Sequence, residues 1–173
     1  MITGKVWKFG DNINTDVILP TAVMYLPPAE QAKHVFASSR PGWAAEVRSG
    51  DFLLAGENFG TGSSRPAPLA LKALGVKCLI ANSINPLFMR NCVSFGLPAI
   101  ECAGIWEAFD EGDTAEVSFE NATVSNIRTA LTFDGTVVPP ALLSLMQKGG
   151  IFPLLESEGL IGPSTNAAAG ATA

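Results

Sequence analysis

The sequence predicts an α/β fold in which helices flank a partly parallel β-sheet. Two continuous apolar runs of strand length, residues 52–55 and 78–81, are typical of strands buried on both faces. Good helix formers at residues 67–74 lie between them, and Gly75 follows as a helix-terminating glycine. A second helix begins near Pro86 and precedes a short strand at residues 98–101. This alternation predicts parallel pairing with right-handed crossovers.

The rest of the chain alternates between short elements and turns. Near the N-terminus we expect a strand at residues 6–9, a short apolar stretch at 17–20 that ends in proline, and short helices at 29–37 and 42–47. Beyond residue 104 we expect a helical stretch at 105–111, strands at 114–119, 123–126 and 130–133, and a final helix at 139–147. The low-complexity run 163–173 predicts a disordered tail, so residues 1–162 form the expected single domain.

Composition excludes several classes of function. The net charge of −5 and the pI near 4.8 argue against nucleic-acid binding, so a bound anion must be held by local donors. No apolar run is long enough for a transmembrane helix, and the N-terminus lacks a signal-peptide core, which makes a cytoplasmic location the default expectation. Hydrophobic residues make up 47% and charged residues 16%, which fits either a large partner interface or a generous core.

Metal-binding and nucleophilic motifs built on cysteine or histidine are not evident. Cys78, Cys92 and Cys102 are widely spaced and resemble neither a disulfide framework nor a metal site, so we expect small buried side chains and no metal ligands. His34 is the single histidine, and we expect it to be solvated or satisfied locally. This scarcity argues against most hydrolase and metalloenzyme mechanisms.

A Gly/Ser-rich loop between the strand at 52–55 and the helix at 67–74 is the strongest candidate site. Loops at the carboxyl ends of parallel strands form ligand-binding crevices. Here glycines let the backbone approach an anion, the helix start adds positive potential, and Arg65 offers a planar fork for a carboxylate. Ser63 and Ser64 add two hydroxyl groups.

The chemistry of this loop favours a small carboxylate over a nucleotide. Residues 60–65 contain neither the lysine of a P-loop nor the third glycine of a dinucleotide fingerprint. The simpler alternative is a turn in which a serine caps the helix and Arg65 is solvated.

The loop and several further segments resemble the small-subunit family of 3-isopropylmalate dehydratase, which is equivalent to the swivel domain of aconitase and homoaconitase. The resemblance runs in the family's order from about Lys5 to Leu155. The matching segments are residues 9–20, 55–65, 70–71, 75–76, 80–83, 88–91, 96–98 and 149–150. It implies an aconitase-swivel-like β/β/α domain.

The resemblance implies half of an active site in a two-subunit hydro-lyase of leucine biosynthesis. A [4Fe–4S] cluster would lie on a separate large subunit, and this chain would bind no cofactor itself. Ser63 would act as the catalytic base, while Ser64 and Arg65, with Gly62 and Thr61, would bind a hydroxy-dicarboxylate substrate. The expected reaction removes water and adds it back at the adjacent carbon.

The resemblance also implies supporting residues. A loop near Leu26 would meet the variable group of the substrate, and no arginine or lysine occurs at residues 21–31; a proline-stiffened loop packed on the partner is the alternative. Thr15 and Asp16 would fix the first loop, or simply form an Asx-turn. Asn58 would support the glycine-rich loop. Arg90 would brace the loop or the partner, although a solvated arginine is the commoner case.

One departure from the family concerns the residue after Arg65. The family usually continues with glutamate and histidine, whereas this chain has Pro66. Loss of the glutamate predicts a less constrained Arg65 guanidinium. It leaves open a different hydroxy-acid substrate, such as a methyl-substituted malate or a homoaconitate-type acid, or a non-catalytic binding module of the same fold.

Overall fold

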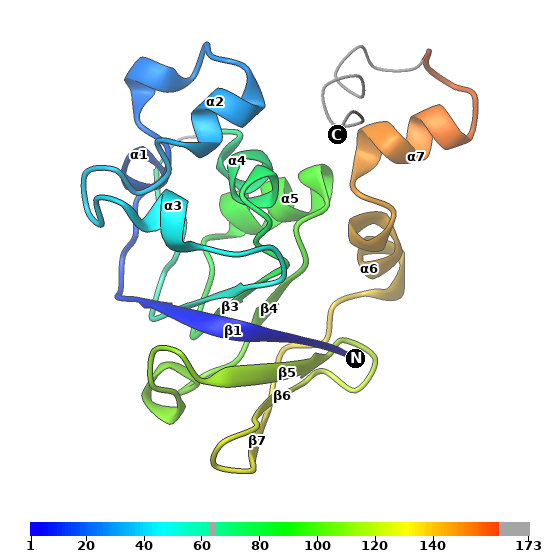
Figure 1. The fold of residues 1–173 in the computed structure, drawn as a ribbon. Helices are drawn as coiled ribbons and strands as arrows, with labels where there is room; N and C mark the ends of the chain where they lie inside the picture. Colours follow the sequence, from blue (N-terminus) through cyan, green and yellow to red (C-terminus); the bar gives the residue numbers. More distant parts are fainter. Residues whose placement is uncertain (63–64, 163–173) are drawn as a thin grey trace.

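The computed structural model describes residues 1–62 and 65–162, and it contains a curled, mixed, seven-stranded sheet (Figure 1). The strands are β1 (Ile2–Phe9), β2 (Phe52–Ala55), β3 (Cys78–Ala81), β4 (Ala99–Glu101), β5 (Thr114–Ser118), β6 (Thr123–Asn126) and β7 (Leu131–Asp134). Their spatial order is β4-β3-β2-β1-β5-β6-β7, in which β1 to β4 pair in parallel and β5 to β7 continue antiparallel. The partly parallel sheet expected from the sequence is therefore confirmed.

Strand β1 joins the two halves of the sheet. Its second half, from Val6 to Phe9, pairs in parallel with β2, and its first half, from Ile2 to Lys5, pairs antiparallel with β5. Side chains alternate between the two faces, as a β-strand requires. Trp7, Leu53 and Leu79 belong to one hydrophobic cluster, whereas their neighbours Val6, Phe52 and Cys78 belong to a second.

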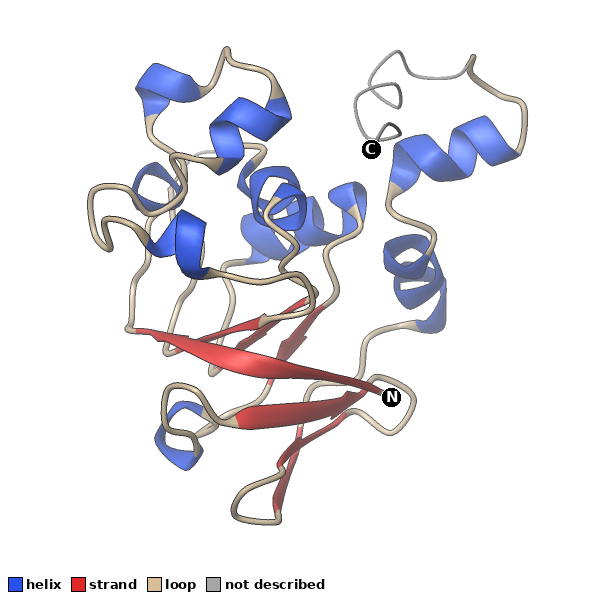
Figure 2. Ribbon diagram, viewed as in Figure 1, coloured by secondary structure: helices blue, strands red, loops and turns tan. Residues whose placement is uncertain are grey.

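Helices cover one face of the parallel half, as Figure 2 shows. The α-helices are α1 (Thr15–Ile18), α2 (Pro28–Ala32), α3 (Trp43–Glu46), α4 (Ala67–Ala73), α5 (Pro86–Phe95), α6 (Pro140–Gln147) and α7 (Ile151–Ser157), with 3-10 turns η1 (Thr21–Val23) and η2 (Trp106–Ala108). The opposite face packs against the region of η2 and against the curled antiparallel strands. No helix in the described part of the chain is long and apolar enough to cross a membrane.

Most expected elements are present, and the differences have local causes. The first two residues of the stretch at 17–20 lie in helix α1, because the side chain of Asn14 accepts a hydrogen bond from the Asp16 amide at the start of that helix; Leu19 and Pro20 follow its end. The helical stretch expected at 105–111 shrinks to the single turn η2. The helix at 139–147 is not the last one, since α7 follows the two left-handed glycines Gly149 and Gly150. The expected tail lies outside the described residues.

A lysine and two glycines dock the C-terminal helices on α5. Lys72 Nζ donates to the Phe95 carbonyl at 2.6 Å and to the Gly149 carbonyl at 3.1 Å. A β-carbon on Gly96 would lie 2.1 Å from the Gly149 carbonyl carbon, so the two backbones touch where they cross. Burial lowers the pKa of Lys72 because the ammonium loses water. The carbonyl oxygens replace part of that hydration.

A charged network stabilises the antiparallel half. The Asp113 carboxylate accepts hydrogen bonds from Arg128 Nε at 2.6 Å, from Asn126 Nδ2 at 2.8 Å and from the Asp110 amide at 3.0 Å. The hydrogen bonds from Arg128 hold the pKa of Asp113 well below the usual aspartate value, against the opposing effect of burial. The ion pair therefore ties the loop before β5 to the loop after β6.

This network predicts a loss of stability in acid. The pKa of Asp113 is lower in the folded than in the unfolded state, so its contribution is present above the unfolded value of about 3.9 and disappears as the pH falls below it. We expect Asp113→Asn to lower the free energy of unfolding by about 1–3 kcal/mol at pH 7 and to flatten its decline below about pH 4. Urea unfolding at pH 7 and pH 3 measures both effects.

The matched control is Asp134→Asn, which alters an exposed aspartate on β7. Its unfolding curve should follow that of the unsubstituted protein at both pH values. An Asp113→Asn protein that lost stability in acid as steeply as the unsubstituted protein would contradict this account.

Candidate functional site

The candidate site lies at the carboxyl edge of the parallel strands, where the loops after β1 and β2 are joined through their backbones. The Ile13 carbonyl accepts hydrogen bonds from the amides of Gly60 at 2.8 Å and Thr61 at 3.1 Å. The Thr15 amide donates to the Thr61 carbonyl at 2.7 Å, and Asn14 and Thr61 form an isolated parallel bridge. Two of the expected site residues, Thr15 and Thr61, are thus brought together in a short extension of the sheet.

Asn58 connects this pair of loops to the loop after β3. Its backbone lies in the left-handed region, with φ of 56°, where asparagine is tolerated better than most residues. Its Nδ2 donates to Asn12 Oδ1 at 3.0 Å, and its amide donates to Ser83 Oγ at 2.8 Å. The Ser83 hydroxyl donates in turn to the Glu57 carboxylate. Three strand-end loops therefore form one hydrogen-bonded unit around Asn58.

Two glycines of the motif are required by close packing as well as by conformation. Gly60 has φ of 84°, and a β-carbon there would lie 2.2 Å from the Phe88 ring. Gly62 has φ of 103°, and a β-carbon there would lie 2.7 Å from Asn14 Oδ1 and 2.9 Å from Thr15 Oγ1. Any side chain at either position would push the loop off α5 or off the start of α1.

Arg65 is buried, with 7% of its surface exposed, so the alternative of a solvated arginine is wrong. Its Nη2 lies 2.5 Å from Asp16 Oδ1 and donates to Thr21 Oγ1 at 2.9 Å. Its Nη1 donates to the Leu19 carbonyl at 3.1 Å and contacts Met24 Sδ at 3.2 Å. A buried guanidinium needs such partners because removing its hydration is costly. Arg65 therefore joins the glycine-rich loop to the whole segment from α1 to Met24.

These contacts correct two expectations. The guanidinium is not left loosely held by the absence of the family glutamate, because Asp16 and Thr21 orient it instead. The helix start also offers fewer amide donors than expected. Pro66, which caps α4, and Pro68 have no N–H, and the Leu69 amide donates to the Pro66 carbonyl at 3.0 Å. Positive charge in the loop at residues 56–66 therefore comes from Arg65.

The other expected site residues do not all lie close to Arg65. Ser63 and Ser64, the expected base and carboxylate ligand, lie outside the described residues. Leu26 is 40% exposed and its neighbour Tyr25 is 92% exposed, on the turn that Arg65 contacts through Met24. Arg90 is exposed on α5, and its side chain makes no hydrogen bond or ion pair with any described residue. Bracing by Arg90 therefore stays a prediction.

The cysteines are small buried side chains, as expected. Burial raises the pKa of all three thiols, to about 11 for Cys102, so neutral thiols are favoured over the thiolates that bind iron. Within the described ranges, no three His, Cys, Asp or Glu side chains are placed to hold a metal ion. The side chains of residues 1–62 and 65–162 therefore do not fit an iron–sulfur cluster.

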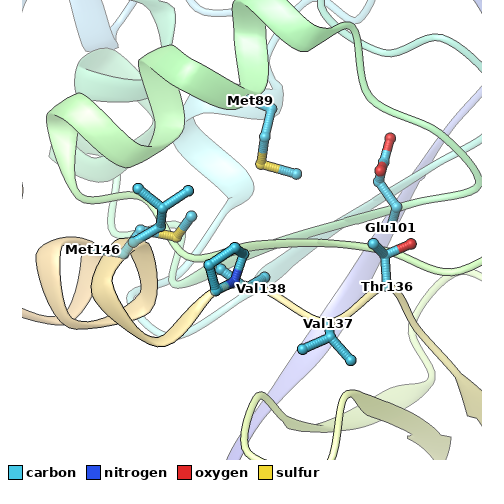
Figure 3. Close-up of a pocket in the computed structure, with 8 residues that line it drawn as sticks. Met89, Glu101, Thr136, Val137, Val138 and Met146 are labelled. Carbon is cyan, nitrogen blue, oxygen red and sulfur yellow. The ribbon is translucent and has the colours of Figure 1, made fainter.

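Two cavities help to locate the binding face. One of about 140 Å³, shown in Figure 3, lies between α5, β4 and α6 and is lined mainly by apolar side chains such as Met89 and Met146. Its carboxylate, Glu101, already accepts the Ile84 amide at 2.7 Å, and none of the expected site residues lines it. Another of about 320 Å³ lies at the strand-end edge but carries the acidic residues Asp11, Glu57 and Glu107. Neither of these two cavities suits an anionic substrate, and none of the expected site residues lines the second one either.

Three contributors to this site had no clear signal in the sequence: Asn14, Thr21 and Gln31. Asn14 caps α1. An asparagine before an apolar stretch is typical of a helix cap, but the pattern is recognisable only once the helix is known. Thr21 is brought to Arg65 by the fold alone. Gln31 is buried in α2 and donates to the turn around Leu26.

Comparison with known proteins agrees with this geometry. The family model of the aconitase C-terminal domain matches residues 12–104, which contain the three strand-end loops. An isopropylmalate/citramalate isomerase small subunit from Methanocaldococcus jannaschii is 41% identical over 160 residues, covering 91% of this chain and 95% of its own length. A 3-isopropylmalate dehydratase small subunit from Archaeoglobus fulgidus is 42% identical over 156 residues, with coverage of 89% and 96%.

A solved structure confirms the expected fold. The crystal structure of a 3-isopropylmalate dehydratase from Methanocaldococcus jannaschii matches with a TM-score of 0.84 at 31% identity, covering 92% of this chain and 95% of that chain. The likeness thus extends over almost the whole of both proteins. The chain belongs to the aconitase C-terminal domain family, among the small subunits of the 3-isopropylmalate dehydratases, which are hydro-lyases.

Proposed function

We propose that this chain is the small subunit of a two-subunit isomerase that dehydrates and rehydrates a hydroxy-dicarboxylate such as isopropylmalate. The observation that carries the proposal is the buried cation Arg65 at the carboxyl edge of the sheet, within the part of the chain that matches the family model. The names of the relatives support the substrate class. The partner is a large subunit that carries a [4Fe–4S] cluster, which supplies a Lewis acid for the substrate hydroxyl.

Within this proposal, Ser63 is the base that removes the proton beside a substrate carboxylate. A serine alkoxide is a strong base that needs stabilisation, and a preorganised positive group in a water-poor site provides it. Arg65, two positions along the chain, is such a group. The two joined loops contribute rigidity, because Thr61 is held by Ile13 and Thr15 on the side of the loop that precedes Ser63.

The substrate carboxylate would approach Arg65 from the side of Asp16. The side chain of Asp16 is 61% exposed, whereas that of Arg65 is 9% exposed, so Asp16 is the part of the ion pair that water and a ligand can reach. A carboxylate that binds Arg65 must therefore share the guanidinium with Asp16 or displace it. Ser64, Gly62 and Thr61 would complete the carboxylate site.

A smaller substrate of the citramalate type is the second candidate. The relative from Methanocaldococcus jannaschii is named for both isopropylmalate and citramalate. The turn near Leu26 carries no arginine or lysine between residues 21 and 31, which disfavours a further carboxylate on the variable group of the substrate. Both candidates therefore have an uncharged alkyl substituent.

Reconstitution tests the proposal. The purified chain, mixed with a cluster-loaded large subunit of a 3-isopropylmalate dehydratase, should turn over isopropylmalate, and either protein alone should not. We expect Ser63→Ala to lower kcat by about 10²–10⁴-fold, the usual contribution of a positioned base. Ser39→Ala, on an exposed serine outside the site, is the matched control. Full turnover by Ser63→Ala would contradict the assigned base, and a pair without any turnover would support a non-catalytic binding module.

The ion pair gives a separate prediction. Asp16→Asn removes the charge that compensates the buried Arg65, so the two loops should separate more easily. We expect a loss of about 1–2 kcal/mol of unfolding free energy, reduced from the value for a fully buried pair because Asp16 is solvated, and a fall in kcat/KM of about tenfold or more in the reconstituted pair. Urea unfolding and steady-state kinetics measure these effects, with Glu30→Gln as a surface control. An unchanged stability together with an unchanged kcat/KM would show that Asp16 does not orient Arg65.

A further inference from the structure

We propose that Gln31 is a positioning residue that holds the turn formed by Met24, Tyr25 and Leu26 in the shape that selects the alkyl group of the substrate. This inference rests on the proposed function, because it assigns that turn to the substrate. The proposed reaction assigns Gln31 no other role. Gln31 would act through the turn and would not touch the reacting atoms.

The side-chain amide of Gln31 spans the turn. Its Nε2 donates to the Met24 carbonyl at 2.9 Å and to the Leu26 carbonyl at 2.8 Å, so both amide hydrogens are used. Gln31 is 5% exposed, and α2, which carries it, packs on α4 directly after the glycine-rich loop. Hydrogen bonds shielded from water hold their geometry better than exposed ones.

The other end of the amide is unsatisfied. Among the described residues, Gln31 Oε1 is buried without a hydrogen-bond partner. The orientation of the amide follows from its surroundings, since two carbonyl oxygens require the nitrogen to face them. An unpaired buried acceptor costs a free energy comparable to what the two hydrogen bonds together contribute, so the two effects largely cancel. Gln31 therefore adds little to stability, and its defined effect is on the conformation of the turn.

The turn needs this support because two of its three side chains are exposed to solvent. Tyr25 is 92% exposed and Leu26 is 40% exposed. Inside the turn, the Met24 amide donates to the Thr21 carbonyl at 3.2 Å and the Leu26 amide donates to the Val23 carbonyl at 3.1 Å, both at the upper end of the usual N–H···O range. Exposed apolar side chains on a weakly bonded turn would otherwise sample several conformations.

Met24 connects this turn to the glycine-rich loop. Gln31 bonds the Met24 backbone, while Arg65 Nη1 contacts the Met24 sulfur at 3.2 Å. The turn is thus fixed to α2 on one side and to the glycine-rich loop on the other. A shift of Leu26 would break a bond to Gln31, and a shift of Met24 would disturb the contact with Arg65. The alkyl contact and the carboxylate contact are therefore held at a fixed separation.

The test compares Gln31→Met with the unsubstituted chain, because methionine keeps the length of the side chain and removes both donors. In the reconstituted pair we expect KM for isopropylmalate to rise about tenfold with kcat within about twofold, and KM for citramalate to change less, since a methyl group makes fewer contacts. Hydrogen exchange of the Met24 and Leu26 amides, which are bonded to Thr21 and Val23, should become faster. The midpoint of thermal unfolding should stay within about 3 °C, because little stability is lost.

Two variants complete the design. Gln31→Glu keeps the shape but cannot donate to carbonyls when ionised, so it should reproduce or exceed the effect of Gln31→Met. Lys33→Gln, on the exposed side of the following turn, should match the unsubstituted chain in every measurement. Unchanged exchange of the Met24 and Leu26 amides in Gln31→Met, or an equal change in KM for both substrates, would overturn the inference. If the unsubstituted chain and the large subunit together showed no turnover, the proposed function would be overturned. The hydrogen-exchange measurement would still decide whether Gln31 holds the turn.

Discussion

The burial of the Arg65 guanidinium is the constraint on which the arrangement of the site depends. A permanently charged group with 7% exposure is tolerated only where oxygen atoms surround it. Asp16, the Leu19 carbonyl and Thr21 supply those oxygens, and all three come from the segment that follows β1. The requirements of one side chain therefore bring the glycine-rich loop after β2 and the start of the chain together. The backbone bonds to Ile13 reinforce the same junction.

This arrangement explains how the chain accommodates proline after the arginine. A glutamate at that position would be one way to orient the guanidinium, but Asp16 already performs that task from another loop. Pro66 instead caps α4, where its missing N–H has no intrahelical partner to lose. Together with Pro68 it reduces the number of amides that face the loop. The electrostatics of the site then depend on side chains more than on the helix start.

Sequence patterns predicted the fold better than they predicted the contacts within the site. Residues 52–55 and 78–81 are apolar without interruption, so their burial between parallel neighbours followed from composition alone. Helix α7 was missed because two glycines and Pro153 resemble the end of a structured region. The glycine-rich loop was recognisable from its sequence. Its contacts with Asp16, Thr21 and, through Met24, Gln31 were not, because these residues lie 34 to 49 positions before Arg65 in the chain. No local sequence pattern encodes contacts over such separations.

The central claim is that Arg65 holds the catalytic loop and the substrate-facing turn as one unit. A crystal structure of the chain bound to its large subunit and an unreactive hydroxy-dicarboxylate tests it most directly. The account predicts that Arg65 keeps its bond to the Leu19 carbonyl and its contact with Met24 while a carboxylate of the ligand lies within hydrogen-bond distance of the guanidinium. A bound ligand whose carboxylates lie away from Arg65, with the loop separated from Met24, would contradict it.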